Sequence, residues 1–432
     1  MHNVLKDESV LKSCKIYSML AGQNKEHISF HTPGHKANGP DITELSYSDN
    51  LACPRGCIAE AEKDIAEILG AAKSFILTDG STCGVLSMLY AAKLLGVEKV
   101  AVCEASHKSL WNGCKLLGIT PLVYPQKTRD KIPFGYTVSA LKTEFSEILR
   151  EADALFVTSP DYYGNVADWR ALREYCDENG KLLLADGAHG GHLHFEKELY
   201  AGAYADVWVD GVHKSLPAFT QGAIVSARTE RITEALRAGV DIFRTTSPSY
   251  PVMASVEYAV KYPRNTRLEA SAKAFEESCR RICFGGDWTK LCAVFGENAF
   301  AAEKELENKG IYAEFCDGNV VMFYLSPATS LHDFEKLRAE LASLFEKYPL
   351  RAEGNGDNCD PAPLVLVKNG ETEEVAITES KGRICARMCG LFPPCTPLLR
   401  VGERIAEEKI RLLERADNVF GVTNGKLTVF KE

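Results

Sequence analysis

A loop of small and hydroxyl-bearing residues follows the apolar run Lys73–Thr78 (KSFILT), which predicts a β-strand. The loop is Asp79–Gly84 (DGSTCG), and a helical pattern begins directly after it. Gly80 lets the backbone approach an anion closely, and Ser81 and Thr82 add hydroxyl donors to the free N–H groups of a helix start. These residues predict a phosphate-binding loop, although a helix cap without a ligand is an equally common use of them.

A carboxylate ends a second apolar strand, Lys181–Asp186 (KLLLAD), and three histidines follow it. A buried Asp186 needs a partner, because desolvation penalises an unpaired charge. One interpretation pairs it with a cationic ring nitrogen of a bound cofactor. A second makes His189, His192 and His194 metal ligands, since the HxxHxH spacing resembles a hydrolase metal site. A third is a buried aspartate beside a solvated, histidine-rich loop.

Lys214 comes just after another apolar strand, Val207–Asp210, and His213 precedes it. Most lysines are solvated surface residues, but burial lowers the pKa of a lysine and favours a nucleophilic amine. Asp186 and Lys214 lie 28 residues apart, enough for one crossover between neighbouring strands. The loop, the aspartate and the lysine in this order predict a pyridoxal 5'-phosphate site. The loop would bind the phosphate, Asp186 would keep the pyridine nitrogen protonated, and Lys214 would form the Schiff base.

Short buried strands must position these residues. Runs that are apolar throughout, separated by helical patterns, are typical of a mostly parallel sheet covered on both faces. Such runs recur from about residue 45 to about residue 260, and ligands of such sheets bind at the carboxyl ends of the strands. The expected strands are Lys73–Thr78, Val100–Cys103, Leu155–Ser159, Lys181–Asp186, Val207–Asp210 and Ala223–Ser226, with helical segments at Val85–Leu95 and His107–Leu117.

The rest of the chain has a different pattern, which suits a smaller α+β domain. Helices are expected at Arg267–Cys283, Phe300–Lys309, Leu331–Glu346 and Arg404–Arg415, strands within Ile311–Leu325 and Leu364–Thr378, and a loop at Glu353–Pro363. We therefore predict an N-terminal arm (1–45), a large cofactor-binding domain (46–265) and a small C-terminal domain (266–432).

Composition excludes several classes of protein. The 432 residues include 50 Lys+Arg and 59 Asp+Glu, a net charge of −9, which argues against nucleic-acid and anionic-membrane partners. No apolar run approaches the roughly 18 residues of a membrane helix, and the N-terminus lacks the pattern of a signal peptide. The 15 cysteines have irregular spacing and no CxxC motif, which suits reduced thiols, so we expect a cytoplasmic location and no structural metal.

Eight motifs in order resemble the Orn/Lys/Arg decarboxylase family of fold-type-I pyridoxal-phosphate enzymes, and the resemblance runs nearly end to end. It implies an α/β, aspartate-aminotransferase-like large domain with a mostly parallel sheet and a small α+β domain. With only thirty residues before the first motif, the resemblance is to the short form without an N-terminal wing domain. The motifs are HTPGHK (His31–Lys36), FILTDGSTCG, EASHKS (Glu104–Ser109), TSPDYYG (Thr158–Gly164), LLADGAHGGHLHF (Leu183–Phe195), HKSLPAFTQ (His213–Gln221), TTSPSY (Thr245–Tyr250) and PPCTPLLRVGE (Pro393–Glu403).

The resemblance also implies a role for each matching residue. Lys214 would bind the cofactor covalently, and Asp186 would pair with its pyridine nitrogen. His107 would stack on one face of the ring and Ala188 would pack beneath the other. The other implied contacts are Gly80, Ser81, Thr82 and His213 at the phosphate, His189 at the phenolic oxygen, and Thr246 and Ser247 at the phosphate of a partner subunit. Such contacts imply a homodimer or higher homo-oligomer with shared sites.

The chain departs from the family pattern in three places. Gly211 stands two residues before His213, where the family usually has serine. Pro217 and Gly222 also replace usual residue types. Near the C-terminus, Cys395 and Arg400 stand where the family has glycine and a nonpolar residue. These departures put phosphate affinity and substrate preference in doubt, but they leave Lys214, Asp186 and His107 in place.

The implied reaction is decarboxylation of arginine, lysine or ornithine to the corresponding amine and CO2, as in polyamine biosynthesis. His213 or Lys214 would protonate the α-carbon, and Asp41, Glu44 or Asp49 would bind the cationic end of the substrate. The alternatives are an aminotransferase or lyase of the same fold, a catalytically idle regulatory paralogue, and the metal hydrolase suggested by the histidines.

Overall fold

A seven-stranded sheet forms the centre of the computed structural model, which describes residues 4–22, 28–129, 132–134, 138–350, 370–392, 395–416 and 418–431. The strand order is β1-β9-β8-β7-β6-β2-β3. All neighbouring pairs are parallel except those of β9, which runs antiparallel to both β1 and β8. The strands are β1 (Lys73–Leu77), β2 (Lys99–Cys103), β3 (Thr120–Tyr124), β6 (Ala154–Thr158), β7 (Leu182–Gly187), β8 (Val207–Asp210) and β9 (Ala223–Ala227).

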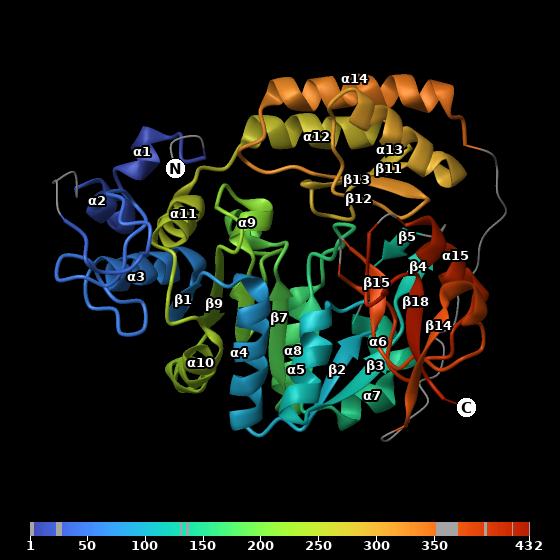
Figure 1. The fold of residues 1–432 in the computed structure, drawn as a ribbon, viewed down its shortest axis with the longest axis horizontal. Helices are drawn as coiled ribbons and strands as arrows, with labels where there is room; N and C mark the ends of the chain where they lie inside the picture. Colours follow the sequence, from blue (N-terminus) through green and yellow to red (C-terminus); the bar gives the residue numbers. More distant parts are fainter. Residues whose placement is uncertain are drawn as a thin grey trace.

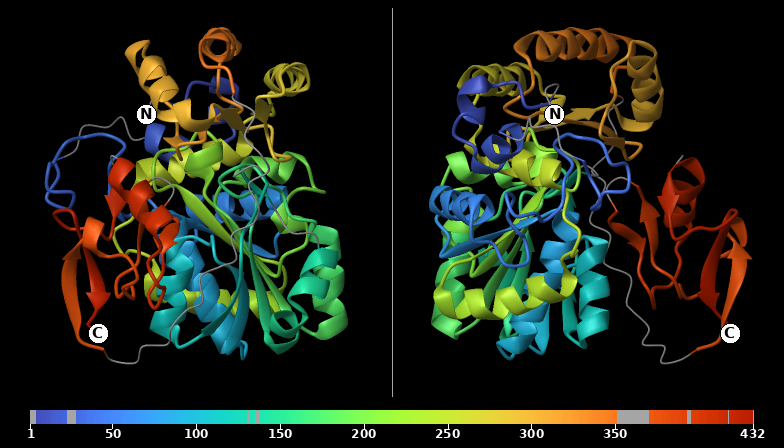
Figure 2. Two further views of the ribbon diagram at one scale, coloured as in Figure 1. Left: turned by 90° about the vertical axis from the view of Figure 1, so that its right-hand side faces the viewer. Right: turned by 60° about the vertical axis from the view of Figure 1, so that its left-hand side comes forward.

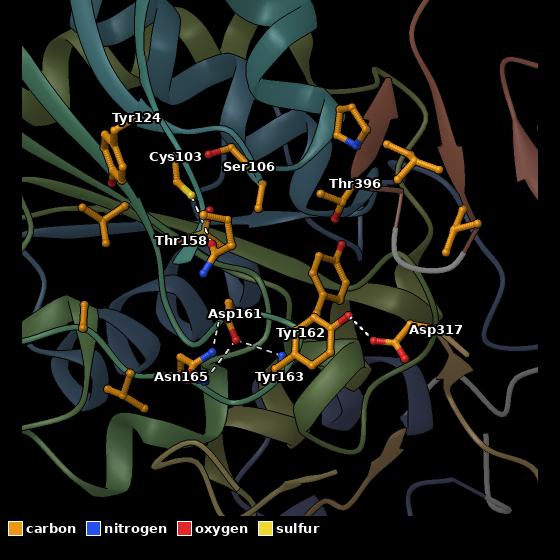
Figure 3. A pocket seen from close by; sticks show the side chains of 18 of the residues that line it. Cys103, Ser106, Tyr124, Thr158, Asp161, Tyr162, Tyr163, Asn165, Asp317 and Thr396 are labelled. Carbon is orange, nitrogen blue, oxygen red and sulfur yellow. Dashed lines mark hydrogen bonds between the residues drawn. The ribbon is translucent and has the colours of Figure 1, made fainter. Parts of the chain in front are cut away.

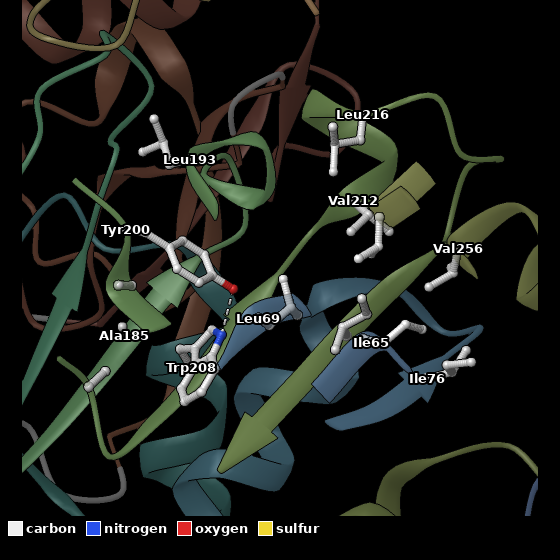
Figure 4. Packing of buried hydrophobic residues seen from close by; sticks show 14 of the residues in the cluster. Ile65, Leu69, Ile76, Ala185, Leu193, Tyr200, Trp208, Val212, Leu216 and Val256 are labelled. Atoms are coloured by element: carbon white, nitrogen blue, oxygen red, sulfur yellow. Dashed lines mark hydrogen bonds between the residues drawn. The ribbon is translucent and has the colours of Figure 1, made fainter. Parts of the chain in front are cut away.

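Helices cover both faces of this sheet (Figure 1). One face packs on α4 (Gly80–Leu94), α5 (Lys108–Leu117) and α10 (Glu230–Phe243). The other packs on α3 (Cys57–Leu69), α8 (Trp169–Asn179) and α11 (Tyr250–Lys261). Figure 4 shows this second core, in which Trp208 of β8 donates a hydrogen bond to the Tyr200 hydroxyl (2.9 Å). The Tyr200 hydroxyl in turn donates to Asp210 (2.6 Å). This chain of donors pairs the Trp208 N–H, the Tyr200 hydroxyl and one oxygen of the Asp210 carboxylate beneath the end of β8.

A buried carboxylate holds the N-terminal residues on the large domain. Glu257 of α11 is fully buried and accepts hydrogen bonds from the backbone N–H groups of Lys15 (2.7 Å) and Ile16 (2.9 Å). These groups open α2 (Lys15–Ala21), which follows α1 (Glu8–Leu11). A carboxylate at a helix N-terminus is stabilising, because it pairs N–H groups that the helix leaves free.

The C-terminal part of the chain carries three further sheets around two separate cores (Figure 2). A four-stranded sheet of order β10-β11-β13-β12 packs on α12, α13 and α14. Beyond it, β14 pairs with β18, and β15 pairs with β16 and β17, around a smaller core that includes α15. The bounds are α12 (Thr266–Ser278), β10 (Ile282–Cys283), β11 (Lys290–Val294), α13 (Ala299–Asn308), β12 (Phe315–Cys316), β13 (Val320–Tyr324), α14 (Leu331–Lys347), β14 (Thr372–Ala376), β15 (Cys389–Leu391), β16 (Pro397–Leu399), α15 (Glu407–Arg415), β17 (Val419–Phe420) and β18 (Lys426–Phe430).

Short elements complete the fold. They are β4 (Lys127–Arg129), β5 (Ile132–Phe134), α6 (Val138–Glu144), α7 (Ser146–Glu151) and α9 (Val212–Ser215), with 3₁₀ turns η1 (Gly191–Phe195), η2 (Ala201–Ala203), η3 (Gly296–Asn298) and η4 (Ile377–Glu379). No helix in the described part of the chain is long and apolar enough to cross a membrane. The cysteines there are all free thiols.

The predicted strands of the large domain lie within two residues of the observed ones. One expected helix, Arg267–Cys283, is wrong at its end, because α12 stops at Ser278 and β10 begins at Ile282. The loop expected at Glu353–Pro363 and the start of the strand region Leu364–Thr378 lie outside the described residues. The division at residues 45 and 265 stays a prediction.

Candidate active site

The predicted site residues meet at one edge of the central sheet. Strands β1, β6, β7 and β8 are mutually parallel, so their carboxyl ends face the same way. The antiparallel strand β9 starts at this edge, and Gln221 before it accepts a hydrogen bond from the Gly80 N–H (2.9 Å). Gly80 has a φ of +74°, a backbone conformation that glycine adopts without strain. The loop after β1 is thus tied to the segment after Lys214.

The loop Asp79–Gly84 leaves polar groups unpaired in the described chain. The Ser81 and Thr78 hydroxyl oxygens are buried there without a hydrogen-bond partner. A Cβ at Gly84 would lie 2.9 Å from Val209 Cγ1, so glycine lets α4 approach β8. Unpaired hydroxyls beside the start of a 15-residue helix suit an oxyanion, because the helix presents free N–H groups there. These residues fit the phosphate of pyridoxal phosphate.

Lys214 and Asp186 are buried together. The Lys214 amine, on α9, donates a hydrogen bond to His189 Nε2 (3.2 Å), and its charge interacts with Asp186. Burial lowers the pKa of Lys214, and the negative charge of Asp186 opposes this shift. Burial raises the pKa of Asp186, whose carboxylate within the described chain accepts one hydrogen bond, from the Ala188 N–H (3.2 Å). A carboxylate with so few donors fits a cationic ring nitrogen.

The hydrogen bonds of two histidines define which ring nitrogen carries the proton. His107 caps α5, and its Nδ1 accepts from the Ser109 backbone N–H (3.2 Å), so the neutral ring carries its proton on Nε2. Burial lowers the pKa of His107 to about 3. His213 Nδ1 donates to the Gly222 carbonyl (2.8 Å), which leaves Nε2 free to accept a proton. Burial also lowers the pKa of His213, so both rings are neutral near pH 7.

The three histidines after β7 do not converge on one point. His189 faces Lys214, whereas His192 donates to Asp287 (2.8 Å) and His194 donates to the Gly191 carbonyl (2.7 Å). No group of three or more metal-binding side chains is found in the described ranges. The geometry therefore gives no support to the metal hydrolase interpretation.

The glycine that replaces the usual serine at position 211 fills a tight space. A Cβ at Gly211 would lie 2.4 Å from the Ala188 carbonyl oxygen and 2.6 Å from Ser81 Oγ. The Ser81 hydroxyl therefore occupies part of the volume that a side chain at position 211 would need. At Gly222, a Cβ would lie 2.8 Å from Val256 Cγ2. Nothing in the structure explains Pro217.

Gly211→Ser is expected to destabilise the protein by about 1–3 kcal/mol, because a Cβ there overlaps a fixed backbone carbonyl. Denaturant unfolding measures this loss. Gly39→Ser is the matched control, since no atom lies within 4 Å of a Cβ at that position. Equal stability of Gly211→Ser and the unaltered protein would contradict this account.

The C-terminal departures have structural explanations. Cys395 has a φ of +60°, which explains why relatives would use glycine there, and its carbonyl accepts from the Lys108 N–H (3.3 Å). Arg400 is buried and forms ion pairs with Glu104 (3.2 Å) and Glu403 (3.2 Å).

The carboxylates proposed for the far end of the substrate have other partners. Asp49 accepts hydrogen bonds from four backbone N–H groups, including those of Gly56 and Ile58 at the start of α3, so it is a helix cap. Asp41 pairs with His35 (3.0 Å). Glu44 accepts from the Thr43 hydroxyl (2.7 Å).

Two site residues were missed by the sequence analysis. Glu314, before β12, interacts electrostatically with Lys214. Tyr162, after β6, packs its ring 4.5 Å from that of His189 and lies 5.9 Å from the Lys214 amine. Tyr162 falls inside the motif Thr158–Gly164, which was the available signal. No sequence signal marks Glu314.

Tyr162 also borders a cavity of about 260 Å³, shown in Figure 3. The cavity is mainly apolar, and Ser106 and Thr158 each place a buried hydroxyl with no partner among the described residues at its wall. On one side, Tyr163 donates a hydrogen bond to Asp317 (2.8 Å). The cavity and the predicted cofactor site thus share Tyr162 as a common wall.

Thr246 and Ser247 lie in the segment that joins α10 to α11, and both are exposed. The preceding Thr245 donates its backbone N–H to Asp79 (3.2 Å), at the start of the phosphate-binding loop. Contact of Thr246 and Ser247 with a partner subunit stays a prediction.

Most of the chain is similar to known decarboxylases and to family models built from them. Residues 16–281 match the family model for the Orn/Lys/Arg decarboxylase major domain, and residues 362–420 match that for its C-terminal domain. The Bacillus subtilis protein YaaO, which is uncharacterised, is 28% identical over 442 residues, and B. subtilis arginine decarboxylase is 26% identical over 447 residues. Each alignment covers 90% of this chain and 90% of the relative.

Solved structures with low sequence identity share the fold. Lysine decarboxylase A from Pseudomonas aeruginosa superposes with a TM-score of 0.76 at 17% identity, over 97% of this chain and 80% of that one. The constitutive lysine decarboxylase of Escherichia coli gives 0.72 at 18% identity, over 99% and 82%. The predicted aspartate-aminotransferase-like fold class is confirmed. Since one family model alone matches more than half of the sequence, the chain belongs to the Orn/Lys/Arg decarboxylase family.

Proposed function

We propose that this protein uses pyridoxal 5'-phosphate to decarboxylate a basic amino acid, releasing CO2 and the corresponding amine. The observation that carries the proposal is the buried Lys214 amine beside Asp186, at the edge of the sheet where the hydroxyls of Thr78 and Ser81 are buried and unpaired in the described chain. Membership of a decarboxylase family selects this reaction from those that the fold supports.

The residues of the site would hold each part of the cofactor. The hydroxyls of Ser81 and Thr82 and the backbone from Gly80 onward would bind the phosphate, together with His213. The ring would lie between His107 and Ala188, with Asp186 at its nitrogen and His189 at its phenolic oxygen. When bound, the cofactor supplies an electron sink for the pair left by departing CO2. The chain must supply the rest: orientation, exclusion of water and a proton.

Lys214 is the best-placed proton donor for the α-carbon. Its ammonium form carries the proton, and its pKa, lowered by burial, makes proton release less costly. His213 is poorly suited to this role, because its free Nε2 is unprotonated near pH 7. The neutral ring of His107 can stack on an aromatic face without placing a charge there.

Glu314 is our candidate for binding the cationic end of the substrate. Glu314 is partly open to solvent, and its carboxylate interacts with the charges of Lys214 and Lys290. Burial raises its pKa, and those two cations oppose the shift. A carboxylate that faces the reacting lysine from the small-domain side would meet a long cationic side chain.

Glu314→Gln is expected to raise the KM for the basic amino acid about ten- to hundred-fold, with a smaller effect on kcat, because a charged hydrogen bond is lost. Steady-state kinetics measures KM and kcat separately for each variant. Glu307→Gln is the matched control, since that carboxylate pairs with the exposed Lys304 one turn away on α13 (2.9 Å). If Glu314→Gln leaves KM unchanged, the cationic end is bound elsewhere.

Purified protein supplied with pyridoxal phosphate should be assayed against arginine, lysine and ornithine. Equal amounts of CO2 and the matching amine are expected from one of them. Formation of a keto acid without CO2 would instead identify an aminotransferase. A protein that binds the cofactor yet transforms none of the three would be an idle paralogue, and the proposed function would be wrong.

We also propose a homodimer with shared sites. The exposed Ile28 and Phe30 leave apolar surface on the N-terminal segment, and Thr246 and Ser247 are exposed next to the phosphate-binding loop. Burying these groups against a second copy would remove apolar area from water.

A further inference from the structure

A second lysine, Lys290, is buried behind the predicted site. Both Lys290 and Asp287 have no exposed surface, and their charged groups lie 3.3 Å apart. The Lys290 amine also donates to the Thr289 hydroxyl (2.8 Å) and to the carbonyl of His189 (3.3 Å), and it lies 4.7 Å from the ring of Tyr324. It thus makes a direct contact with the residue that holds Lys214.

The turn before Lys290 also contacts two loops at the carboxyl edge of the central sheet, the loop after β6 and the loop after β7. Gly164 lies so close to the turn that a Cβ there would be 2.3 Å from the Phe284 carbonyl oxygen. The Asp287 N–H donates to the Gly164 carbonyl (3.1 Å), and its carboxylate accepts from His192 (2.8 Å). The turn between β10 and β11 therefore fixes the loop of Tyr162 and the loop of His189 together.

A buried ion pair costs desolvation, and an apolar pair of similar size often gives equal or greater stability. Packing alone therefore does not account for a lysine here. Its charge acts on the site. Burial is the largest cause of the lowered pKa of His189, and the charges of Lys214 and Lys290 lower that pKa further. Burial also lowers the pKa of Lys214, and the charge of Lys290 adds to that shift. Burial works to raise the pKa of Asp287, but His192 and Lys290 hold it below its usual range. The titratable and charged groups that face Lys290 are Asp287, His192, His189, Tyr324, Glu314 and Lys214.

We propose that Lys290, anchored by Asp287, is a positioning residue that holds His189 against Lys214 and supplies a second fixed positive charge near the Lys214 amine. The inference rests on the proposed function only in taking Lys214 as the residue that binds the cofactor. The small domain would thereby act on the chemistry of the large one.

The test is the pH dependence of covalent attachment of pyridoxal phosphate to the apoprotein, followed by visible absorbance without any amino acid substrate. Without the charge of Lys290, the pKa of Lys214 rises and less neutral amine is present at a given pH. Lys290→Met is therefore expected to move the midpoint of attachment to higher pH. It should also slow attachment at the high-pH plateau, because His189 loses a contact.

Lys290→Met leaves Asp287 buried without its lysine and is expected to lower the unfolding temperature. The double variant Lys290→Met/Asp287→Asn removes both charges, so it should recover stability while the midpoint stays high. Lys73→Met is the matched control: Lys73 pairs with the buried Glu62 (2.7 Å) at the start of β1, far from the edge that carries the site. It should lose stability and keep the midpoint of the unaltered protein.

A midpoint and a plateau that stay unchanged in the folded double variant would overturn the proposal, since the pair would then be structural only. It would fall equally if the unaltered protein attached no cofactor at any pH. A protein that attaches the cofactor normally but releases no CO2 would contradict the proposed function alone.

Discussion

Lys214→Ala is expected to abolish decarboxylation, with a loss of at least about 10⁴-fold in kcat, and to remove the visible absorbance of the bound cofactor. The other lysine buried beside the site, Lys290, is not free to replace it. Lys290 is fully buried, and its amine already contacts Asp287, Thr289 and His189. Release of CO2 and the absorbance spectrum are the two measurements.

Lys181→Ala is the control for this variant, because Lys181 lies at the opposite end of β7 and its amine donates to backbone carbonyls there. It should keep both signals. Turnover that survives in Lys214→Ala would show that the reaction does not pass through this amine.

Asp186→Asn is expected to lower kcat by about 10²–10⁴-fold while cofactor attachment persists. The loop Asp79–Gly84 and Lys214 are unchanged in this variant, but a neutral amide cannot hold a ring nitrogen in its protonated form. The variant should also move the pH midpoint of attachment downward, because the charge of Asp186 opposes the lowering of the Lys214 pKa. The two Lys290 variants should move the same midpoint upward.

Asp210→Asn is the matched control, since Asp210 is also a buried aspartate at a strand end. Burial raises its pKa to about 7, and the Tyr200 hydroxyl donates to it. It should affect stability more than kcat. An equal loss of kcat in both variants would show that position 186 has no special part in the chemistry.

The residues at the ends of β7 and β8 could be predicted because two simple rules apply to them. An apolar run that ends in a charged residue marks the end of a buried strand, and parallel strands bring such ends together. Asp186 and Lys214 therefore come together in the structure, although their roles remain a proposal. The antiparallel direction of β9 was not predictable, because a fully buried strand reads the same in either direction.

The small-domain residues could not be predicted because their contacts depend on how separate sheets pack. Glu314 and Lys290 lie at the edges of short strands, in patterns typical of solvated charges, and only packing brings them near Lys214. Asp49 is the opposite case. Its position near the motif His31–Lys36 suggested that Asp49 binds the cationic end of the substrate. In the structure, both oxygens of its carboxylate instead accept hydrogen bonds from backbone N–H groups at and before the start of α3.

The pairing of β1 with β9 has a consequence for synthesis on the ribosome. Ser74 and Ser226 meet across these strands through a hydroxyl–hydroxyl bond of 2.8 Å, although they lie 152 residues apart in the chain. At roughly 5–20 residues per second, β1 and the loop after it wait on the order of 10 s for their partner strand. The nascent chain cannot complete the loop that we assign to phosphate until Lys214 has already been translated. The proposed cofactor site is therefore completed only late in synthesis.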